Sequence, residues 1–238
     1  MSQKPFQFKL FKVEQQNTAM KVGTDGVLLG AWVEISENIN SILDVGSGTG
    51  LIGLMMAQRS DASTIDAVEI EDAAYIQCVE NFEQSDWGDR LFCYHVSFQE
   101  FAKEIDEKYD LIISNPPFYN TTNLSSSKNK SIAKHTQQLN FEELLNGVNK
   151  LLSQQGNCAF IIPYTEEEYF LKLAANLKLY PKKITHVKGH KNAPYKRSLL
   201  QLSYINKQPI INDLIIEIER HVYTNEYKSL VKDFYLNM

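Results

Sequence analysis

The stretch that most constrains this chain runs from Asp110 to Phe118 and reads Asp-Leu-Ile-Ile-Ser-Asn-Pro-Pro-Phe. Its apolar run, residues 111–113, is typical of a strand that is buried on both faces of a parallel sheet. The two prolines that follow supply no N–H to a strand ladder, so the strand must end there. We therefore expect an amide, a carbonyl before proline and an aromatic ring at the carboxyl end of a strand, where open α/β sheets bind their ligands.

Strand and helix patterns alternate around this stretch. Strands are predicted at 41–45, 64–69, 90–96 and 157–163, and helices at 51–58, 72–84, 98–104 and 141–152. This alternation predicts an α/β fold with a mainly parallel sheet, right-handed crossovers and helices on both faces. Two further strands without a helix between them, at 184–187 and 198–205, predict an antiparallel edge strand, and Thr165 to Glu168 is predicted to cap a helix.

The chain shows no internal repeat and no linker, so 238 residues predict a single domain. We expect a short N-terminal arm, about 1–20, and a C-terminal strand and helix extension, about 209–238. The sequence contains no apolar run of membrane-spanning length and no signal peptide core. Three scattered cysteines, Cys78, Cys93 and Cys158, predict buried thiols in a reducing cytoplasm instead of disulfides or a zinc site.

Glycines recur at alternate positions after the first predicted strand, at Gly46, Gly48 and Gly50. They let a ligand approach the backbone just before a helix N-terminus. A Gly-x-Gly-x-x-Gly pattern also begins at Gly48, but Asp44 is a poor neighbour for a pyrophosphate and a good one for a cationic or hydroxyl-bearing ligand. Glu69, at the end of the second strand, is placed to hold a ribose diol, or else is a charge at a helix start.

A second polar turn lies earlier in the chain, where two glycines bracket Thr24 and Asp25 before an apolar run. One interpretation is a helix cap without further function. The other is that polar groups and N–H donors converge there on the charged end of a ligand, which makes Lys21, Thr24, Asp25 and Gly26 candidate binding residues. Ser97, at the end of the third strand, is a further candidate.

Basic residues are concentrated in two segments of this acidic chain, whose net charge is −5. One is a long polar segment, 119–138, and the other lies between Tyr169 and Asn212, where no acidic residue occurs. The seven candidate phosphate-binding residues are Lys128, Lys130, Lys134, Lys188, Lys191, Lys196 and Arg197. The alternative is that these cations are scattered over solvated helix and strand surfaces.

The Asn-Pro-Pro-Phe turn suits chemistry on a planar nitrogen. The side-chain oxygen of Asn115 and the carbonyl of Pro116 can accept the N–H groups of an exocyclic amine, which orients the amine and stabilises its growing positive charge. Phe118 offers a face for stacking, worth about 1–3 kcal/mol per base. The sequence contains no recognisable metal cluster and no nucleophile paired with a base, so we expect no metal.

These motifs resemble class I S-adenosylmethionine-dependent methyltransferases that act on amino groups. Three blocks, Met20–Trp32, Leu111–Pro117 and Phe234–Met238, are also similar to bacterial tRNA1(Val) adenine-N6 methyltransferases. The resemblance implies a seven-stranded methyltransferase sheet, S-adenosylmethionine as cofactor, tRNA as substrate, and methylation of the adenine next to the valine anticodon. Separately, we expect a monomer located in the cytoplasm. Two positions depart from the family pattern: Phe118 stands where tyrosine is common, and Ser97 where an aspartate commonly reads the cofactor's adenine.

Other functions share some of these motifs. Asn-Pro-Pro-Phe also occurs in ribosomal guanine-N2 methyltransferases, and the related Asn-Pro-Pro-Tyr in protein glutamine N-methyltransferases. A nicotinamide-dependent oxidoreductase would leave the Asn-Pro-Pro-Phe turn without a role. A non-catalytic RNA-binding protein with the same fold would not bind S-adenosylmethionine, and identification of the methylated product separates the remaining alternatives.

Overall fold

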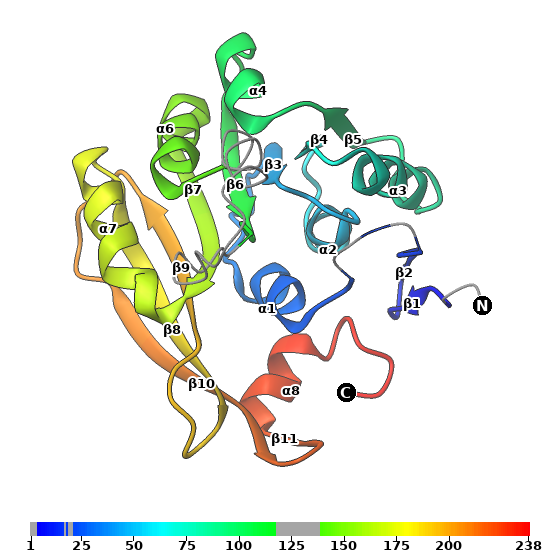
Figure 1. Ribbon diagram of the computed structural model, residues 1–238, viewed down its shortest axis with the longest axis vertical. Coiled ribbons are helices and arrows are strands. Elements are labelled where there is room, and N and C mark those ends of the chain that lie inside the picture. The colour runs from blue at the N-terminus through cyan, green and yellow to red at the C-terminus, as the bar shows by residue number, and fades with distance from the viewer. Residues whose placement is uncertain (1–3, 17, 19–20, 118–138) are drawn as a thin grey trace, which may run out of the picture.

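The computed structural model describes residues 4–16, 18, 21–117 and 139–238. Its centre is a nine-stranded sheet with the order β11-β10-β8-β9-β7-β6-β3-β4-β5 (Figure 1). The strands are β3 (Ser41–Val45), β4 (Thr64–Glu69), β5 (Leu91–His95), β6 (Tyr109–Ser114), β7 (Leu152–Pro163), β8 (Tyr180–His190), β9 (Arg197–Ser203), β10 (Ile210–Glu219) and β11 (Val222–Tyr223).

Helices cover both faces of this sheet (Figure 1). They are α1 (Thr24–Trp32), α2 (Leu51–Arg59), α3 (Asp72–Glu83), α4 (Phe98–Glu104), α6 (Phe141–Leu151), α7 (Glu167–Asn176) and α8 (Asn225–Val231), with a 3₁₀ turn η1 (Tyr164–Glu166) before α7. Because alternate strand residues point to opposite faces, Ile42 belongs to the core cluster that includes residues of α1, α2, α3 and α8, whereas Leu43 belongs to the cluster that includes residues of α4, α6 and α7.

The strand directions confirm the predicted α/β class and its mixed sheet. Strands β5, β4, β3, β6 and β7 are parallel neighbours, while β9 runs antiparallel to β7 and β8. The sheet has nine strands instead of the expected seven, because the C-terminal extension adds β10 beside β8 and β11 as an antiparallel edge. Leu214 of β10 is buried in the core. The pairing of β10 with β8 covers a strand edge that β8 would otherwise expose.

Some predicted boundaries were wrong. Strand β7 begins at Leu152, five residues before the predicted start. The first part of the strand contains exposed polar residues, which carry no apolar strand pattern, and its pairing with β6 includes a register shift. The predicted cap at Thr165 is also wrong, since α7 begins at Glu167 without a side-chain cap. Cys78 and Cys158 are buried free thiols as predicted, but Cys93 is only partly buried.

The N-terminal arm forms a hairpin of β1 (Phe6–Gln7) and β2 (Lys12–Val13) that packs on the C-terminal segment. The N–H of Lys9 donates to the carbonyl of Phe234 at 2.8 Å, and the Phe8 and Tyr235 rings stack with centroids 5.7 Å apart. The ends of the chain therefore share one core cluster with α1 and α2. No helix in the described part of the chain is long and apolar enough to cross a membrane.

Candidate active site

The carboxyl ends of β3, β4 and β6 meet at one edge of the sheet. Val45 is in register with Val68 of β4 and with Ser114 of β6, so the residues that follow these positions come together. A cavity of about 280 Å³ lies there. The predicted residues that line it are Gly46, Gly48, Glu69, Ser97 and Asn115.

The glycine turn requires its glycines for two different reasons. Gly48 has φ +56° and its N–H donates to Oε2 of Glu69 at 2.8 Å, so the turn and the acid are directly joined. Gly50 has φ +79°, and a Cβ there would lie 2.6 Å from the ring of Phe82. Both conformations are costly for residues with a side chain.

Glu69 is held in place by backbone N–H groups. Its Oε1 accepts from Ile70 at 2.8 Å and from Glu71 at 2.9 Å, while Oε2 accepts from Gly48. An ionised carboxylate has about four lone-pair sites, and these three N–H groups occupy three of them, so one site on Oε2 remains for a ribose hydroxyl. Its position at the cavity fits S-adenosylmethionine.

Asp44 lies beneath the glycine turn and does not line the cavity. Its side chain is fully buried; Oδ2 accepts from the N–H of Gly53 at 3.1 Å, and Oδ1 has no partner among the described residues. Burial raises the pKa of Asp44 to about 7, the Gly53 N–H opposes this rise, and the charge of Glu69 adds to it. Burial therefore favours the protonated form of Asp44, and only its ionised form favours a cationic ligand nearby.

Asn115 lines the same cavity and carries a buried side-chain acceptor. The hydroxyl of Ser114 donates to the Val45 carbonyl at 2.7 Å and fixes the end of β6, after which Asn115 lines the cavity with its Oδ1 shielded from solvent. This Oδ1 has no partner among the described residues. A buried acceptor without a hydrogen bond is costly, so it is suited to a ligand's N–H. Pro116 is buried beside it, and Phe118 lies outside the described residues.

Apolar wall residues were missed in the sequence. Ile70, Val96 and Phe98 line the cavity, and Ile70 is 47% exposed despite its size. The sequence signal for these wall residues was their position at or shortly after the ends of β4 and β5. Ser97 also lines the cavity, but its hydroxyl caps α4, accepting from the Glu100 N–H at 3.2 Å and donating to the Glu100 carboxylate at 2.6 Å. Together, the apolar walls, the carboxylate of Glu69 and the Oδ1 of Asn115, which has no partner among the described residues, fit S-adenosylmethionine and an amine substrate.

The Gly-Thr-Asp-Gly turn lies away from the described walls of this cavity. Lys21 and Thr24 are exposed, and neither Thr24 nor Asp25 caps α1. The carboxylate of Asp25 instead accepts from Nε of Arg197 at 2.8 Å, which ties the start of α1 to β9. A Cβ on Gly26 would lie 3.1 Å from Leu51, so this glycine allows α1 to pack closely on α2.

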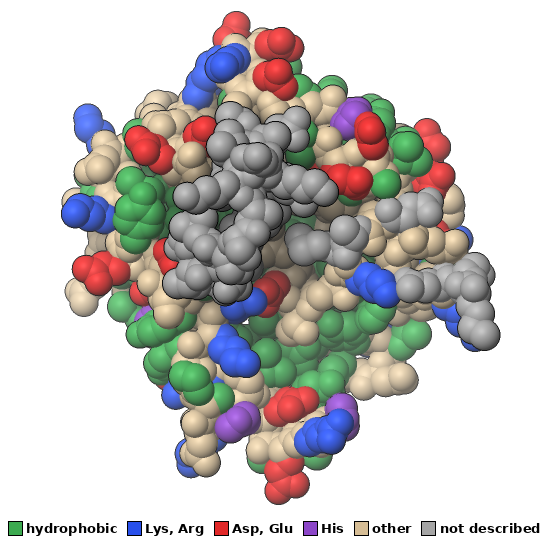
Figure 2. Space-filling view, in the orientation of Figure 1, with side chains coloured by type: hydrophobic (Ala, Val, Ile, Leu, Met, Phe, Trp, Pro, Cys, Tyr) green, Lys and Arg blue, Asp and Glu red, His purple; other side chains and the backbone are tan. Residues whose placement is uncertain are grey.

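The predicted basic residues of the described chain lie on and beside the β8–β9 hairpin. Strand β8 runs parallel to β7, since both are antiparallel to β9, so the hairpin extends from the same sheet edge as the cavity. Lys191 and Lys196 are exposed, and Nζ of Lys188 lies 4.3 Å from the Tyr195 ring centroid. Figure 2 shows Lys and Arg side chains on this face interspersed with acidic and hydrophobic ones. Lys128, Lys130 and Lys134 lie outside the described residues.

No metal site competes with this assignment in the described ranges, which contain no group of three or more His, Cys, Asp or Glu side chains able to hold an ion. The prediction that the protein binds no metal concerned the whole sequence, and it stays a prediction. The residues that converge at the cavity therefore define the candidate active site.

Known proteins are similar to this chain in sequence and in structure. Residues 26–167 match the family model "Methyltransferase small domain". Proteins named tRNA1(Val) (adenine(37)-N6)-methyltransferase from Christiangramia forsetii and Flavobacterium psychrophilum are 52% and 54% identical, covering 100% and 98% of this chain and 100% of each relative. A crystal structure described as a predicted O-methyltransferase of Agrobacterium tumefaciens is 17% identical with a TM-score of 0.68, covering 88% of this chain and 96% of that one, and shows the shared fold.

Proposed function

Because this chain belongs to the family of tRNA1(Val) (adenine(37)-N6)-methyltransferases, we propose that it transfers a methyl group from S-adenosylmethionine to the N6 amine of adenine 37 in tRNA1(Val). The observation that carries the assignment to this site is the buried Oδ1 of Asn115, which has no partner among the described residues; Asn115 lines one cavity with the glycine turn and Glu69.

Asn115 and Pro116 are proposed to bind the adenine amine. Oδ1 of Asn115 accepts one N–H of N6 and the Pro116 carbonyl accepts the other. Two acceptors hold the nitrogen lone pair in the direction of attack and stabilise the positive charge that develops on nitrogen. The rigid proline pair limits motion of both acceptors. Phe118 is proposed to stack on the adenine ring.

The cofactor-binding residues are proposed to act through hydrogen bonding, close backbone approach, charge and wall contacts. Bound S-adenosylmethionine supplies an electrophilic methyl group on a sulfonium. Glu69 accepts a ribose hydroxyl at its remaining acceptor site, and Gly46 and Gly48 allow close approach to the backbone. Asp44 acts from beneath the turn through its charge, and Ser97 contributes to the wall around the adenine of the cofactor.

The Gly-Thr-Asp-Gly turn has a supporting role in this proposal. Lys21, Thr24, Asp25 and Gly26 were expected to contact the cofactor. In this proposal Asp25 orients Arg197 through their ion pair. The side chains of Asp25 and Arg197 are 29% and 32% exposed. Because partly exposed ion pairs contribute little to stability, we assign this pair to positioning the hairpin. Lys188, Lys191 and Lys196 are proposed to bind tRNA phosphates, together with the predicted lysines of segment 119–138.

The proposal extends to the organisation of the molecule. Residues 1–238 act as one methyltransferase domain with an N-terminal arm and a C-terminal extension, supported by the core cluster that both ends join. The protein acts as a monomer in the cytoplasm, where its tRNA substrate is made.

Methyl transfer to an unmodified tRNA1(Val) transcript tests this function. The transcript, purified protein and isotope-labelled S-adenosylmethionine are incubated, and nucleosides are identified by mass spectrometry. We expect N6-methyladenosine, and no product from a control transcript with guanine in place of the target adenine. Product on guanine N2 or on protein glutamine, or no transfer to this transcript, would contradict the proposal.

A further inference from the structure

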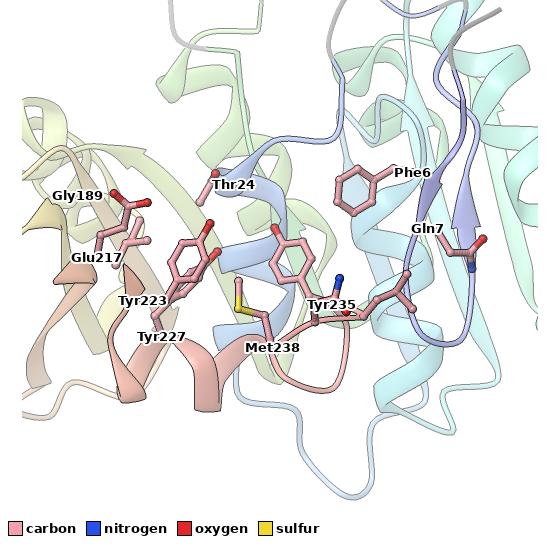
Figure 3. A pocket seen from close by; sticks show the side chains of 12 residues that line it. Phe6, Gln7, Thr24, Gly189, Glu217, Tyr223, Tyr227, Tyr235 and Met238 are labelled. Atoms are coloured by element: carbon pink, nitrogen blue, oxygen red, sulfur yellow. The ribbon is translucent and has the colours of Figure 1, made fainter. Parts of the chain in front are cut away.

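A second and larger cavity of about 620 Å³ lies between the N-terminal hairpin, the start of α1 and the C-terminal segment (Figure 3). Two blocks that the cofactor cavity does not use meet here: Thr24 of the Gly-Thr-Asp-Gly turn, and Tyr235 to Met238 of the chain end. We call this space the tyrosine cleft, defined by Phe6, Thr24, Glu217, Tyr223, Tyr227 and Tyr235.

We propose that the tyrosine cleft binds an unpaired nucleobase of the RNA substrate, at a position other than the base that is methylated. The inference rests on the proposed function, because it requires RNA as the substrate. Its volume lies in the range of about 300–1,000 Å³ typical of small-molecule sites.

Aromatic rings line the cleft in two pairs, which a hydrogen bond between the side chains of Tyr227 and Tyr235 joins. Tyr223 and Tyr227 lie with centroids 5.2 Å apart at 37°, and Phe6 and Tyr235 lie 6.0 Å apart at 64°. Figure 3 shows the first pair on one side of the cleft and the second pair on the other, with Met238 between them. Tyr227 is buried, whereas Tyr223 and Tyr235 are partly exposed and able to contact a ligand. Flat aromatic walls suit a flat heterocycle, because every base has a stacking face.

The charges of the cleft select the base over the phosphate backbone. Glu217 is in the lining, and its carboxylate would repel a phosphate but would accept hydrogen bonds from the N–H edge of a base. At the rim, Gly189 lies between Lys188 and His190, with Lys191 next along the hairpin. A Cβ on Gly189 would meet nothing within 4 Å, so the rim is open there. The carboxylate of Glu217 inside the cleft and the cations near Gly189 therefore favour a base inside the cleft and phosphate groups outside it.

The cleft is placed to act on the same RNA as the active site. Its rim at Gly189 is at the carboxyl end of β8, the sheet edge from which Asn115 also extends. Thr24 precedes Asp25, whose bond to Arg197 joins α1 to the β8–β9 hairpin. A polynucleotide that crosses this edge passes both cavities, and a splayed base in the cleft would fix its register.

Direct RNA binding by matched tyrosine variants tests the proposal. The change is Tyr223→Leu, which keeps apolar bulk and removes the aromatic face, and the control is Tyr169→Leu on exposed α7. Binding of a fluorescent unmodified tRNA1(Val) transcript is measured by anisotropy. We expect Tyr223→Leu to weaken binding about 5- to 150-fold, the range that one base–aromatic stack provides, and Tyr169→Leu to leave it unchanged. Equal affinities for wild type and Tyr223→Leu would overturn the proposal.

Photo-crosslinking gives a second measurement that does not depend on how Tyr223→Leu folds. The wild-type protein is irradiated with the transcript, and crosslinked peptides are identified by mass spectrometry. We expect a nucleotide attached to the peptide of Tyr223 or Tyr235, and crosslinks confined to other peptides would overturn the proposal. Methyl transfer is measured in parallel: its absence with Tyr223-dependent RNA binding would refute the proposed function alone, and its presence with Tyr223-independent binding would refute the cleft alone.

Discussion

Asp44→Asn should make this protein more stable at neutral and alkaline pH. The carboxyl is fully buried, and its pKa rises from 3.8 to about 7. Between these two values the native state binds a proton that the unfolded chain has released, so the free energy of unfolding falls as pH rises through this window and levels off above pH 7. A difference of about three pKa units corresponds to about 4 kcal/mol at 1.36 kcal/mol per unit.

Asparagine keeps the shape of Asp44 and an oxygen acceptor for the Gly53 N–H, but it carries no charge. The difference in free energy of unfolding between variant and wild type should therefore be near zero at pH 4 and approach about 4 kcal/mol in favour of the variant at pH 8. Urea titrations followed by circular dichroism across this range measure it, with exposed Asp61→Asn as the control. A pH-independent difference, or a less stable variant at pH 8, would show that the buried charge does not have the assigned cost.

Three further changes probe catalysis, RNA binding and the glycine turn. Asn115→Ala should lower kcat at least about 100-fold, as loss of one preorganised polar contact does, with nearly unchanged S-adenosylmethionine binding by calorimetry; comparable loss of both would mean that the residue is misassigned. Replacing Lys188, Lys191 and Lys196 of the hairpin with glutamine should weaken tRNA binding and reduce the slope of log K against log salt concentration by about 2–3, since each phosphate contact contributes about 0.7–0.9. An unchanged slope would mean that these lysines do not contact phosphates. Gly50→Ala should destabilise the fold by about 2–5 kcal/mol, from a left-handed backbone and a contact 2.6 Å from Phe82, whereas Gly189→Ala has open space and should change stability little in the same denaturation assay.

The candidate site was largely predictable because its motifs follow strand ends. Gly46 and Asn115 directly follow the strands that end at Val45 and Ser114, Gly48 comes two residues after Gly46, and Glu69 is the last residue of its strand. Parallel strands carry such positions to one edge. The long β7 was harder to delimit, since its first residues are polar and exposed and carry no periodic signal.

Ion pairs across the fold were beyond sequence reasoning. Asp25 and Arg197 were assigned to different ligands, yet they bond to each other across 172 positions in the chain. A charged side chain reveals its sign but not its partner, because the partner is selected by how α1 and β9 pack.

The sequence by itself determined the α/β class, the order of its elements and the place of the Asn-Pro-Pro turn at a strand end, because periodicity, glycine spacing and proline geometry are local properties of the chain. Tertiary structure alone decided that Asp44 lies beneath the turn, that the C-terminal extension enlarges the sheet to nine strands, and that Tyr235 and Thr24 face the same cleft. Burial and long-range pairing depend on which surfaces the folded chain brings together, and that information is distributed over the whole sequence.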